Sequence, residues 1–493
     1  MQKNFELSEI ADVLHHLNYR WTLNALALWK GERTPIETYR IYEGYENFLS
    51  PGTLASIDSL QNDVERNRLR HSFIDHWLQK AVLPNEAEMR TWMKGAAASV
   101  NGVKIYFRDI IPWCQKFSTY ETRKILQEEI RALCKFLKPF ALNYWNMVLE
   151  VLKEDFGFQN YPDYCQRKKK IDYPRCYDLV KEILADTETI YFNAMEKWCH
   201  SRFNRHLDEL SRFDAINLLS LRQFDSLFPN VGMESVAEFF RCWDIDIKNQ
   251  PGLNLELGEE NEKSAQAICV ILQTPEEVYI LMRPQGGLSD LETLMHELGH
   301  GLSAVFTSPE LSLIDREMAT SFALSESFAF LVQDLMMSKP FLQDFLGLTS
   351  QGSDVLSFHK ALRNLSLFRR YGAKFISEYD MFLNNDISDG VPYSTLMRRY
   401  TGFYYQPEAH LFDLAPEFYS VDYMLGWMAG AMMEDFLHSR LGDYWMFHRD
   451  TGDILKNWWK QGNQYDLLQF LDRNELGYLR PDLMVKRWRT FLT

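Results

Sequence analysis

The sequence predicts a mostly α-helical protein in two lobes, with one small β hairpin in the second lobe. Three observations support this fold class: helical periodicity through the first half, a change of composition near residue 250, and two short β-rich runs directly after it. The chain has 493 residues, of which 46% are hydrophobic. That is enough for two ordinary domains or one large two-lobed domain, each with a sizeable core.

The first half of the chain is helical in pattern from residue 5 to about residue 245. A representative stretch carries apolar residues at steps of four, three and four, with charged residues on the opposite face: Leu126, Ile130, Leu133 and Leu137. Breaks such as Leu83-Pro84-Asn85 separate the expected helices. We expect residues 1–248 to form an N-terminal helical lobe.

A boundary between the lobes is expected at residues 249–264. This segment begins with Asn-Gln-Pro-Gly and continues into an acidic run, which is typical of a hinge or loop. Two β-rich runs follow at 267–272 and 278–282, separated by Thr-Pro-Glu-Glu, and they predict a hairpin. Residues 265–493 would then form the second lobe.

Charge and cysteine content restrict the partners and the compartment. The net charge of −15 argues against nucleic acid, and the one basic run, 167–170, is expected at a solvated helix end or loop. The seven cysteines include no Cys-x-x-Cys pair, which predicts free thiols in a reducing compartment. The N-terminus lacks the apolar run of a signal peptide, and the most apolar segment, 423–433, is too short to span a bilayer. We therefore expect a cytoplasmic protein with no membrane partner.

One helix carries the residues with the clearest chemistry. Ser289 and Glu292 have the spacing of a capping box, so a helix is expected to begin there. His296 and His300 are four residues apart, slightly more than one turn, so both imidazoles project from one face toward a shared point. Glu297 between them completes His-Glu-x-x-His, in which two histidines bind zinc and the glutamate is the general base of a metallopeptidase.

A catalytic zinc site requires a third protein ligand and one open position. The next helical stretch carries Glu326 in apolar surroundings, with 25 residues between it and His300. A buried carboxylate is costly unless it is paired or bound to a metal, so Glu326 is the expected ligand. Glu317 is the competitor, but its charged neighbours indicate a solvated helix start.

These residues resemble the thimet-oligopeptidase and oligoendopeptidase F metallopeptidases. The run from Asp290 to His300 is similar to the zinc helix of that family, and a Glu on a second helix about 25 residues later is the family's third ligand, which supports Glu326. The resemblance implies a nearly all-helical fold with a deep central cleft, one Zn²⁺ per chain and short peptides as substrates. The hairpin would lie beside the zinc helix.

A second segment, Phe418 to Gly426, resembles the family's Phe-Tyr-x-x-x-Tyr-x-x-Gly pattern. The resemblance implies that Tyr419 and Tyr423 donate hydrogen bonds to the oxygen that becomes negative during peptide hydrolysis. The family also has a transition-state histidine a few residues before these tyrosines, and His410 is the nearest candidate. Tyrosines four residues apart on a helix are also common in ordinary core packing.

Two features depart from the family pattern. Ser327-Phe328-Ala329 follows the expected ligand Glu326, where the family has Pro-Ser-Gln. Phe330 stands where several zinc peptidases have an Asp, so the sequence does not identify the hydrogen-bond partners of the histidines.

The predicted function is zinc-dependent hydrolysis of internal peptide bonds in short peptides. The nearest alternative is a helical zinc carboxypeptidase, which needs an Arg or Lys for the terminal carboxylate. Four arginines are available for that role: Arg369, Arg370, Arg398 and Arg399. The other alternative is a helical protein that binds peptides without cleaving them, although a structural zinc site would have no use for Glu297.

Overall fold

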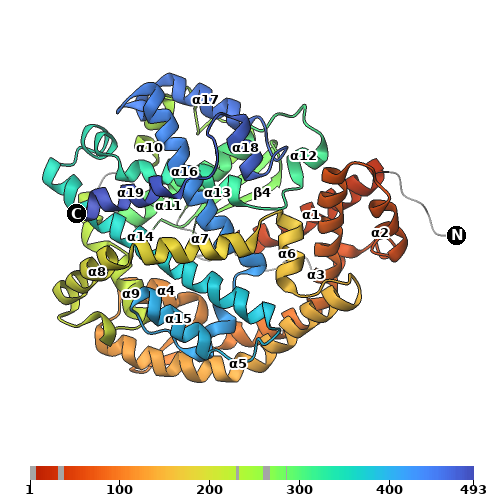
Figure 1. The fold of residues 1–493 in the computed structure, drawn as a ribbon, viewed down its shortest axis with the longest axis horizontal. Coiled ribbons are helices and arrows are strands. Elements are labelled where there is room, and N and C mark those ends of the chain that lie inside the picture. The colour runs from red at the N-terminus through yellow and green to blue at the C-terminus, as the bar shows by residue number, and fades with distance from the viewer. Residues whose placement is uncertain (1–6, 31–37, 229–231, 259–266, 285) are drawn as a thin grey trace. The chain divides into compact units, whose positions relative to one another are not determined.

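A computed structural model describes residues 7–30, 38–228, 232–258, 267–284 and 286–493, and most of them are helical (Figure 1). Its contacts group the chain into two compact units, each built from three separate segments. Unit 1 comprises residues 1–80, 225–350 and 425–483, and unit 2 comprises residues 81–224, 351–424 and 484–493. The lobes expected from the sequence, 1–248 and 265–493, are each one continuous segment and so differ in kind from these units. The expected boundary between the lobes stays a prediction.

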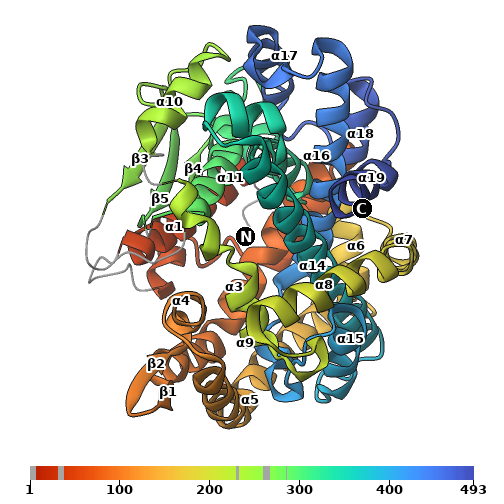
Figure 2. The same ribbon diagram turned by 90° about the vertical axis from the view of Figure 1, so that its left-hand side faces the viewer.

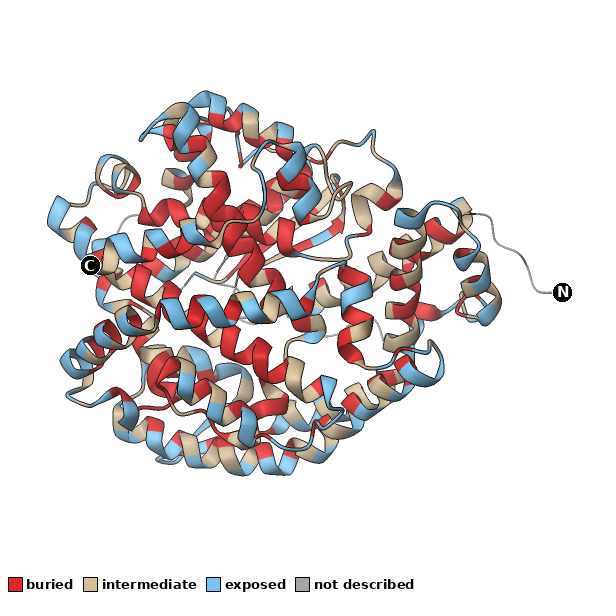
Figure 3. Cartoon of the chain, in the orientation of Figure 1, coloured by how far each residue is buried: buried red, intermediate tan, exposed pale blue. Residues whose placement is uncertain are grey.

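Unit 1 combines helices from the beginning, middle and end of the chain. Its helices are α1 (Leu7–Lys30), α2 (Pro51–Asp58), α10 (Met233–Arg241), α11 (Leu288–Val305), α12 (Leu313–Glu317), α13 (Ala323–Gln333), α17 (Arg449–Trp459) and α18 (Leu467–Arg473). The first part of α3 (Asp63–Gly95) and the second part of α16 (Tyr419–Leu441) also belong to it. Figure 3 shows that buried residues predominate along α11, α13 and α16.

Unit 1 also holds a three-stranded sheet in the order β3-β5-β4. Strands β4 (Ile268–Gln273) and β5 (Glu277–Met282) are antiparallel, which confirms the predicted hairpin. Strand β3 (Leu253–Leu257) pairs with β5 in parallel. Part of the expected hinge is therefore a strand, and the alternating leucines of Leu253–Leu257 suit a strand with one buried face. Residues 259–264 of the expected hinge lie outside the described residues.

Helix α11 packs against this sheet (Figure 2). A Cβ atom added at Gly301 would lie 3.0 Å from Cδ1 of Ile280 and 3.2 Å from Cδ1 of Leu253, so the absence of a side chain allows the helix to approach the strands closely. The hairpin thus lies beside the helix that carries both histidines, as expected from the sequence.

The expected capping box of α11 is not formed. The helix begins at Leu288, one residue before Ser289, and its N-cap is Gly287, which makes no side-chain capping bond. Instead, the Leu288 N–H donates to the Asp225 carboxylate at 3.1 Å. A carboxylate from a distant segment thus accepts a hydrogen bond from one of the free N–H groups at the helix start. Its negative charge also interacts favourably with the positive end of the helix dipole. Asp225 lies 63 residues before Leu288, so the local sequence around the helix start could not predict this bond.

Unit 2 contains the longest helices and a small hairpin that the sequence did not predict, β1 (Ala97–Val100) with β2 (Val103–Tyr106). Its helices are α4 (Ile110–Lys116), α5 (Tyr120–Glu154), α6 (Tyr161–Lys169), α7 (Tyr173–Asp186), α8 (Glu188–Phe203), α9 (Arg212–Leu219), α14 (Ser350–Leu383) and α15 (Val391–Thr401). The second part of α3, the start of α16 and the end of α19 (Pro481–Leu492) complete it. In Figure 2 the hairpin lies beside α4 and α5, where Ala98, Ile105 and Leu126 share one buried cluster.

Two further expectations from the sequence are corrected in unit 2. The predicted break at Leu83-Pro84-Asn85 is absent, because Pro84 lies inside the continuous helix α3. The basic run 167–170 does end a helix, α6, but Lys168 and Lys169 are buried rather than solvated. All seven cysteines are free, as expected. Among the described residues, no helix is both long and apolar enough to cross a bilayer.

Candidate metal centre

Three side chains of unit 1 converge on one point. The potential ligand atoms of His296, His300 and Glu326 all lie within 4.8 Å of one another. The Glu326 carboxylate is 3.6 Å from Nε2 of His296 and 3.7 Å from Nε2 of His300. Two ligands at 2.0–2.2 Å from a tetrahedral ion are roughly 3.3–3.6 Å apart, so this spacing suits a shared metal. This is the only such group within the described part of the chain.

The two histidines meet because of the period of α11. Their imidazole rings are 4.9 Å apart between centroids, with ring planes nearly perpendicular at 85°. Residues four apart on a helix lie on one face, and Leu298 and Gly299 between them are buried in the core of unit 1. The helical spacing that suggested a shared point in the sequence therefore holds in the structure.

Glu326 reaches the histidines because α11 and α13 approach each other very closely. A Cβ atom added at Gly299 would lie 2.5 Å from Cα of Ala329, so only glycine fits between the two helices. On the other side, a Cβ atom added at Gly426 of α16 would lie 2.5 Å from Cβ of Glu326. Glycines thus bring neighbouring backbones to both sides of α13, and Glu326 is only 1% exposed.

Helix α13 also supplies a partner for each histidine. The Ser325 hydroxyl is 2.7 Å from Nδ1 of His300. The Gln333 side chain lies close enough to His296 to favour the protonated form of its imidazole. A hydrogen bond at Nδ1 orients the imidazole of His300 and directs Nε2 toward Glu326. One short helix therefore carries the third candidate ligand, the group that orients His300 and a polar neighbour of His296.

Neither Ser325 nor Gln333 is among the residues expected from the sequence to take part in the site. A usable signal exists for Gln333, because it stands seven residues after Glu326 and so lies on the same helical face two turns later. Ser325 directly precedes Glu326, and only the packing of α13 on α11 brings its hydroxyl to His300.

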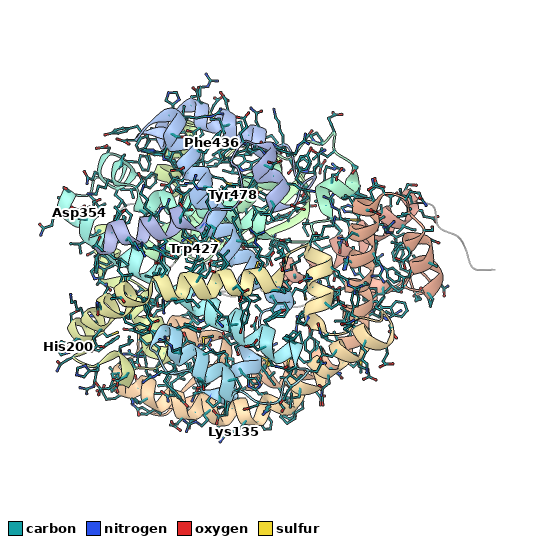
Figure 4. All side chains as sticks on the ribbon, in the orientation of Figure 1. Lys135, His200, Asp354, Trp427, Phe436 and Tyr478 are labelled. Atoms are coloured by element: carbon teal, nitrogen blue, oxygen red, sulfur yellow. The ribbon has the colours of Figure 1, made fainter. Side chains whose placement is uncertain are left out.

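An aromatic wall stands where several zinc peptidases have a carboxylate. Phe330 meets the ring of His296 edge-on, with centroids 5.4 Å apart. Phe330 in turn stacks on Trp427, with centroids 4.7 Å apart and planes 11° apart. Trp427 projects from α16 and is labelled in Figure 4. On the side of Phe330, His296 is therefore bounded by stacked aromatic rings.

Burial keeps both imidazoles neutral in the metal-free protein. It lowers the pKa of His296 to about 4, although the Gln333 side chain opposes this shift. Burial lowers the pKa of His300 well below its usual range, and the neighbouring His296 adds to the effect. A metal binds the deprotonated imidazole, so the histidines are in the form that can accept an ion at neutral pH.

Glu297 lies next to this group but is not part of it. Its Oε2 accepts a hydrogen bond of 2.7 Å from the backbone N–H of Cys269 on β4. Burial raises the pKa of Glu297 to about 7, and the bond from Cys269 opposes that rise. A carboxyl group with a pKa near neutrality can take up and release a proton under ordinary conditions.

Glu317, the competing third ligand, has a different place. It lies at the end of α12, where its carboxylate accepts a hydrogen bond of 2.7 Å from the Thr274 N–H at the turn between β4 and β5. It is therefore engaged with the hairpin, while Glu326 joins the two histidines.

The other predicted site residues belong to unit 2. Tyr419 and Tyr423 are half-buried on the first turns of α16, and the Tyr423 ring lies 4.8 Å from that of Tyr371. His410 is buried, with Nδ1 2.8 Å from the Pro407 carbonyl oxygen and Nε2 3.0 Å from the Ile387 carbonyl oxygen. The catalytic roles of these three residues stay predictions.

The residues present fit a zinc ion. Two imidazole nitrogens and one carboxylate oxygen are the donor set of one class of catalytic zinc site, and three protein ligands leave a fourth position for water or substrate. The spacing between Glu326 and the two imidazoles and the oriented ring of His300 are both consistent with that arrangement.

The sequence matches no protein-family model and no curated protein. The fold does match solved structures. One is described as "a putative oligoendopeptidase F" from Bacillus anthracis str. Ames, with a TM-score of 0.56 and 14% sequence identity. The match covers 98% of this chain and 84% of the other. The expected resemblance is therefore confirmed for the fold, which extends over nearly the whole chain, and the chain also carries a His-His-Glu group that can bind a metal ion.

Proposed function

We propose that this protein is a zinc-dependent metallopeptidase that hydrolyses internal bonds of short peptides. The observation that carries the proposal is the convergence of His296, His300 and Glu326, with Glu297 beside them on the same helix. A site built only to stabilise the fold would be closed by four protein ligands, whereas three ligands leave one position open.

Zinc bound by His296, His300 and Glu326 would acidify a water molecule and polarise the scissile carbonyl group. Glu297 takes a proton from the attacking water as the oxygen adds to the carbonyl carbon. It then delivers a proton to the leaving amine when the carbon–nitrogen bond breaks. The pKa of about 7 that burial gives to this carboxyl group suits both transfers near neutral pH.

Tyr419 and Tyr423 are proposed to donate hydrogen bonds to the negative oxygen of the tetrahedral intermediate. Each such donor contributes about 3–4 kcal/mol to transition-state stabilisation in well-studied enzymes. The helix that carries them, α16, continues into unit 1, where Gly426 packs on Glu326. His410 is the third candidate donor. To bind the substrate through Nδ1, it would have to give up its hydrogen bond with the Pro407 carbonyl oxygen, which would require movement of the segment around Pro407.

The name of the matching structure supports oligopeptides as substrates, because it describes an oligoendopeptidase. Cleavage of internal bonds is further supported by the four arginines considered for a carboxypeptidase. Arg369 donates to the carbonyl groups of Tyr400 and Leu184, and Arg399 makes two bonds to the Glu188 carboxylate. Arg398 donates to the Asp208 carbonyl, and Arg370 pairs with Asp413 at 2.5 Å. All four are thus engaged within unit 2.

The proposal is tested with an internally quenched peptide blocked at both ends, incubated with zinc-loaded protein with and without a chelator. Chelator-sensitive internal cleavage is the expected result. Release of single residues from an unblocked peptide, with the blocked peptide intact, would indicate a carboxypeptidase instead. Zinc binding without cleavage of either peptide would contradict the proposal and favour a peptide-binding protein.

A further inference from the structure

The turn that precedes the two proposed oxyanion tyrosines has an unusual backbone. Glu417 has φ 52° and ψ 35°, and Phe418 has φ 51°, so two consecutive residues with side chains adopt the left-handed conformation. This region is disfavoured for residues other than glycine. Strained backbone persists only where its surroundings determine it, and it is concentrated at functional sites. Tyr419 follows directly as the first residue of α16.

Helix α6 provides hydrogen-bond partners for the N–H, the carbonyl oxygen and the carboxylate of Glu417. The N–H of Glu417 donates to the Tyr161 hydroxyl at 2.8 Å, and its carbonyl oxygen accepts a bond of 2.6 Å from the Lys169 ammonium. Its carboxylate pairs with Lys168, also at 2.6 Å. Because every polar group of this residue is held from one helix, its left-handed conformation is determined by contacts far away in the sequence.

Phe418 is fixed by packing instead. Its side chain is buried among aromatic rings of unit 2, and the ring of Tyr173 is 5.1 Å away and that of Tyr161 5.6 Å away. Both strained residues of the turn are therefore held in place, one by hydrogen bonds and the other by apolar contacts.

Lys169 makes a second contact that extends this control into α16. Its ammonium pairs with the carboxylate of Asp422, which lies between Tyr419 and Tyr423, and the two side chains are 1% and 0% exposed. A fully buried ion pair is a poor way to gain stability, because the cost of removing both charges from water offsets most of the attraction. It does fix geometry, since neither charge can move without losing its partner.

Resting on the function proposed above, we propose that Lys169 is a positioning residue for peptide hydrolysis. Its single ammonium joins the strained turn, through the Glu417 carbonyl, to the first turns of α16, through Asp422. In this way it sets the orientation of Tyr419 and Tyr423 without touching the substrate. The buried part of the basic run 167–170 thereby acquires a role that a solvated helix end would not have.

The test compares Lys169→Met with Arg167→Met. Arg167 is an exposed neighbour on α6 whose contacts, an ion pair with Asp163 and a cation–π contact with Phe158, are both local in sequence. With the quenched peptide, we expect kcat of Lys169→Met to fall about ten-fold or more, with KM within about two-fold, because the affected contacts form in the transition state. Metal content should not change. Lys169→Arg should restore most of the loss, and Arg167→Met should match the unmodified protein.

Hydrogen exchange provides a readout that does not require activity. Amides at 419–424 should exchange about ten-fold faster in Lys169→Met than in the unmodified protein or in Arg167→Met. If the unmodified protein cleaves no peptide, the proposed function fails, while exchange still decides whether Lys169 orders this turn. If Lys169→Met does not fold, Lys169→Met combined with Asp422→Leu removes both charges and should show the same loss. Unchanged kcat or unchanged exchange in a folded variant would overturn the proposal.

Discussion

Two regions are built in different ways: the metal group of unit 1 (His296, His300 and Glu326) and the tyrosine turn of unit 2 (Glu417 and Phe418, directly before Tyr419). In unit 1, helical periodicity places His296 and His300 on one face, and close packing through Gly299 brings Glu326 to them. In unit 2, two left-handed residues precede Tyr419, and a buried ion pair between Lys169 and Asp422 holds the result. The metal group follows from regular structure, whereas the turn depends on contacts between segments about 250 residues apart.

This difference has a physical cause. A metal ligand group needs a few atoms at fixed spacing, and a helix provides that spacing without strain. In the proposed function, Tyr419 and Tyr423 would have to point toward the substrate oxygen from the first turns of α16. Helical periodicity does not fix the direction in which a helix begins. Remote side chains therefore fix the terminus, and the protein carries buried charge to do so.

The largest expected effect separates the two regions by metal content. His296→Ala removes one of three ligands, so bound zinc should fall from about one per chain to near zero. Lys169→Met should retain the full metal content. Zinc is measured after dialysis, with His438→Ala as a control, because His438 is an exposed histidine of unit 1 paired with Asp443. Full zinc content in His296→Ala would refute the ligand assignment.

The close packing behind Glu326 can be disturbed without changing any ligand. A Cβ atom at Gly426 would lie 2.5 Å from Cβ of Glu326, so Gly426→Ala forces α13 and α16 apart. We expect a loss of about 1–3 kcal/mol in the free energy of unfolding, together with weaker zinc binding. Gly430→Ala, one turn later, is the matched control, because its nearest contacts are 3.1 Å and 3.2 Å away. Equal effects from both variants would show that Glu326 is not specifically affected.

Burial of Glu297 predicts a pH dependence in the metal-free protein. The pKa of this carboxyl is about 7 in the folded state, above its usual 4.5, so the folded state holds the proton more tightly than the unfolded state. Its contribution to stability is therefore present below about pH 4.5 and lost as pH rises through 7. Glu297→Gln should be more stable than the unmodified protein by about 2–3 kcal/mol near pH 8.5, and little different near pH 4.5.

This difference is measured by urea unfolding of chelator-treated protein at the two pH values. Other titrating groups are common to both proteins and cancel in the comparison. A stability difference that is the same at both pH values would contradict the assigned burial of Glu297.

The smallest expected effects concern the groups that orient the histidines. Ser325→Ala removes the hydrogen-bond partner of His300, and Gln333→Leu removes the polar side chain of α13 that interacts with His296. Each should weaken zinc affinity by about ten-fold. Ser327→Ala is the matched control on the same helix, because the Ser327 hydroxyl donates to the Leu324 carbonyl instead. Affinity is measured by competition with a zinc-binding dye. An effect of Ser327→Ala equal to that of Ser325→Ala would show that the loss is not specific to the histidine partner.

Much of the metal group could be predicted from the sequence because the patterns that indicate it each lie within one short segment. The His-Glu-x-x-His spacing and the isolated acidic Glu326 in an apolar helix both lie within single helices. The hairpin beside α11 was predicted for the same reason. The start of α11 was not, because its stabilising carboxylate is Asp225 from another segment. The hydroxyl of Ser325 likewise gains its role only through the packing of α13.

The tyrosine turn shows why the rest could not be predicted. Nothing near Glu417 in the sequence indicates a left-handed residue, since local preference would place glycine or asparagine there. The run 167–170 has the composition of a solvated helix end, and only its partners Glu417 and Asp422 explain the burial of Lys168 and Lys169. The division into two units built from separate segments has no local sequence signal either.

In the proposed mechanism, Glu297 acts as the base beside a metal held by His296, His300 and Glu326. Glu297→Gln tests it most directly, because the amide keeps the size of the side chain and can still accept the bond from Cys269. We expect about one zinc ion per chain and a loss of turnover of about 10²–10⁴-fold on the quenched peptide. Undiminished turnover by the zinc-loaded variant would contradict the account.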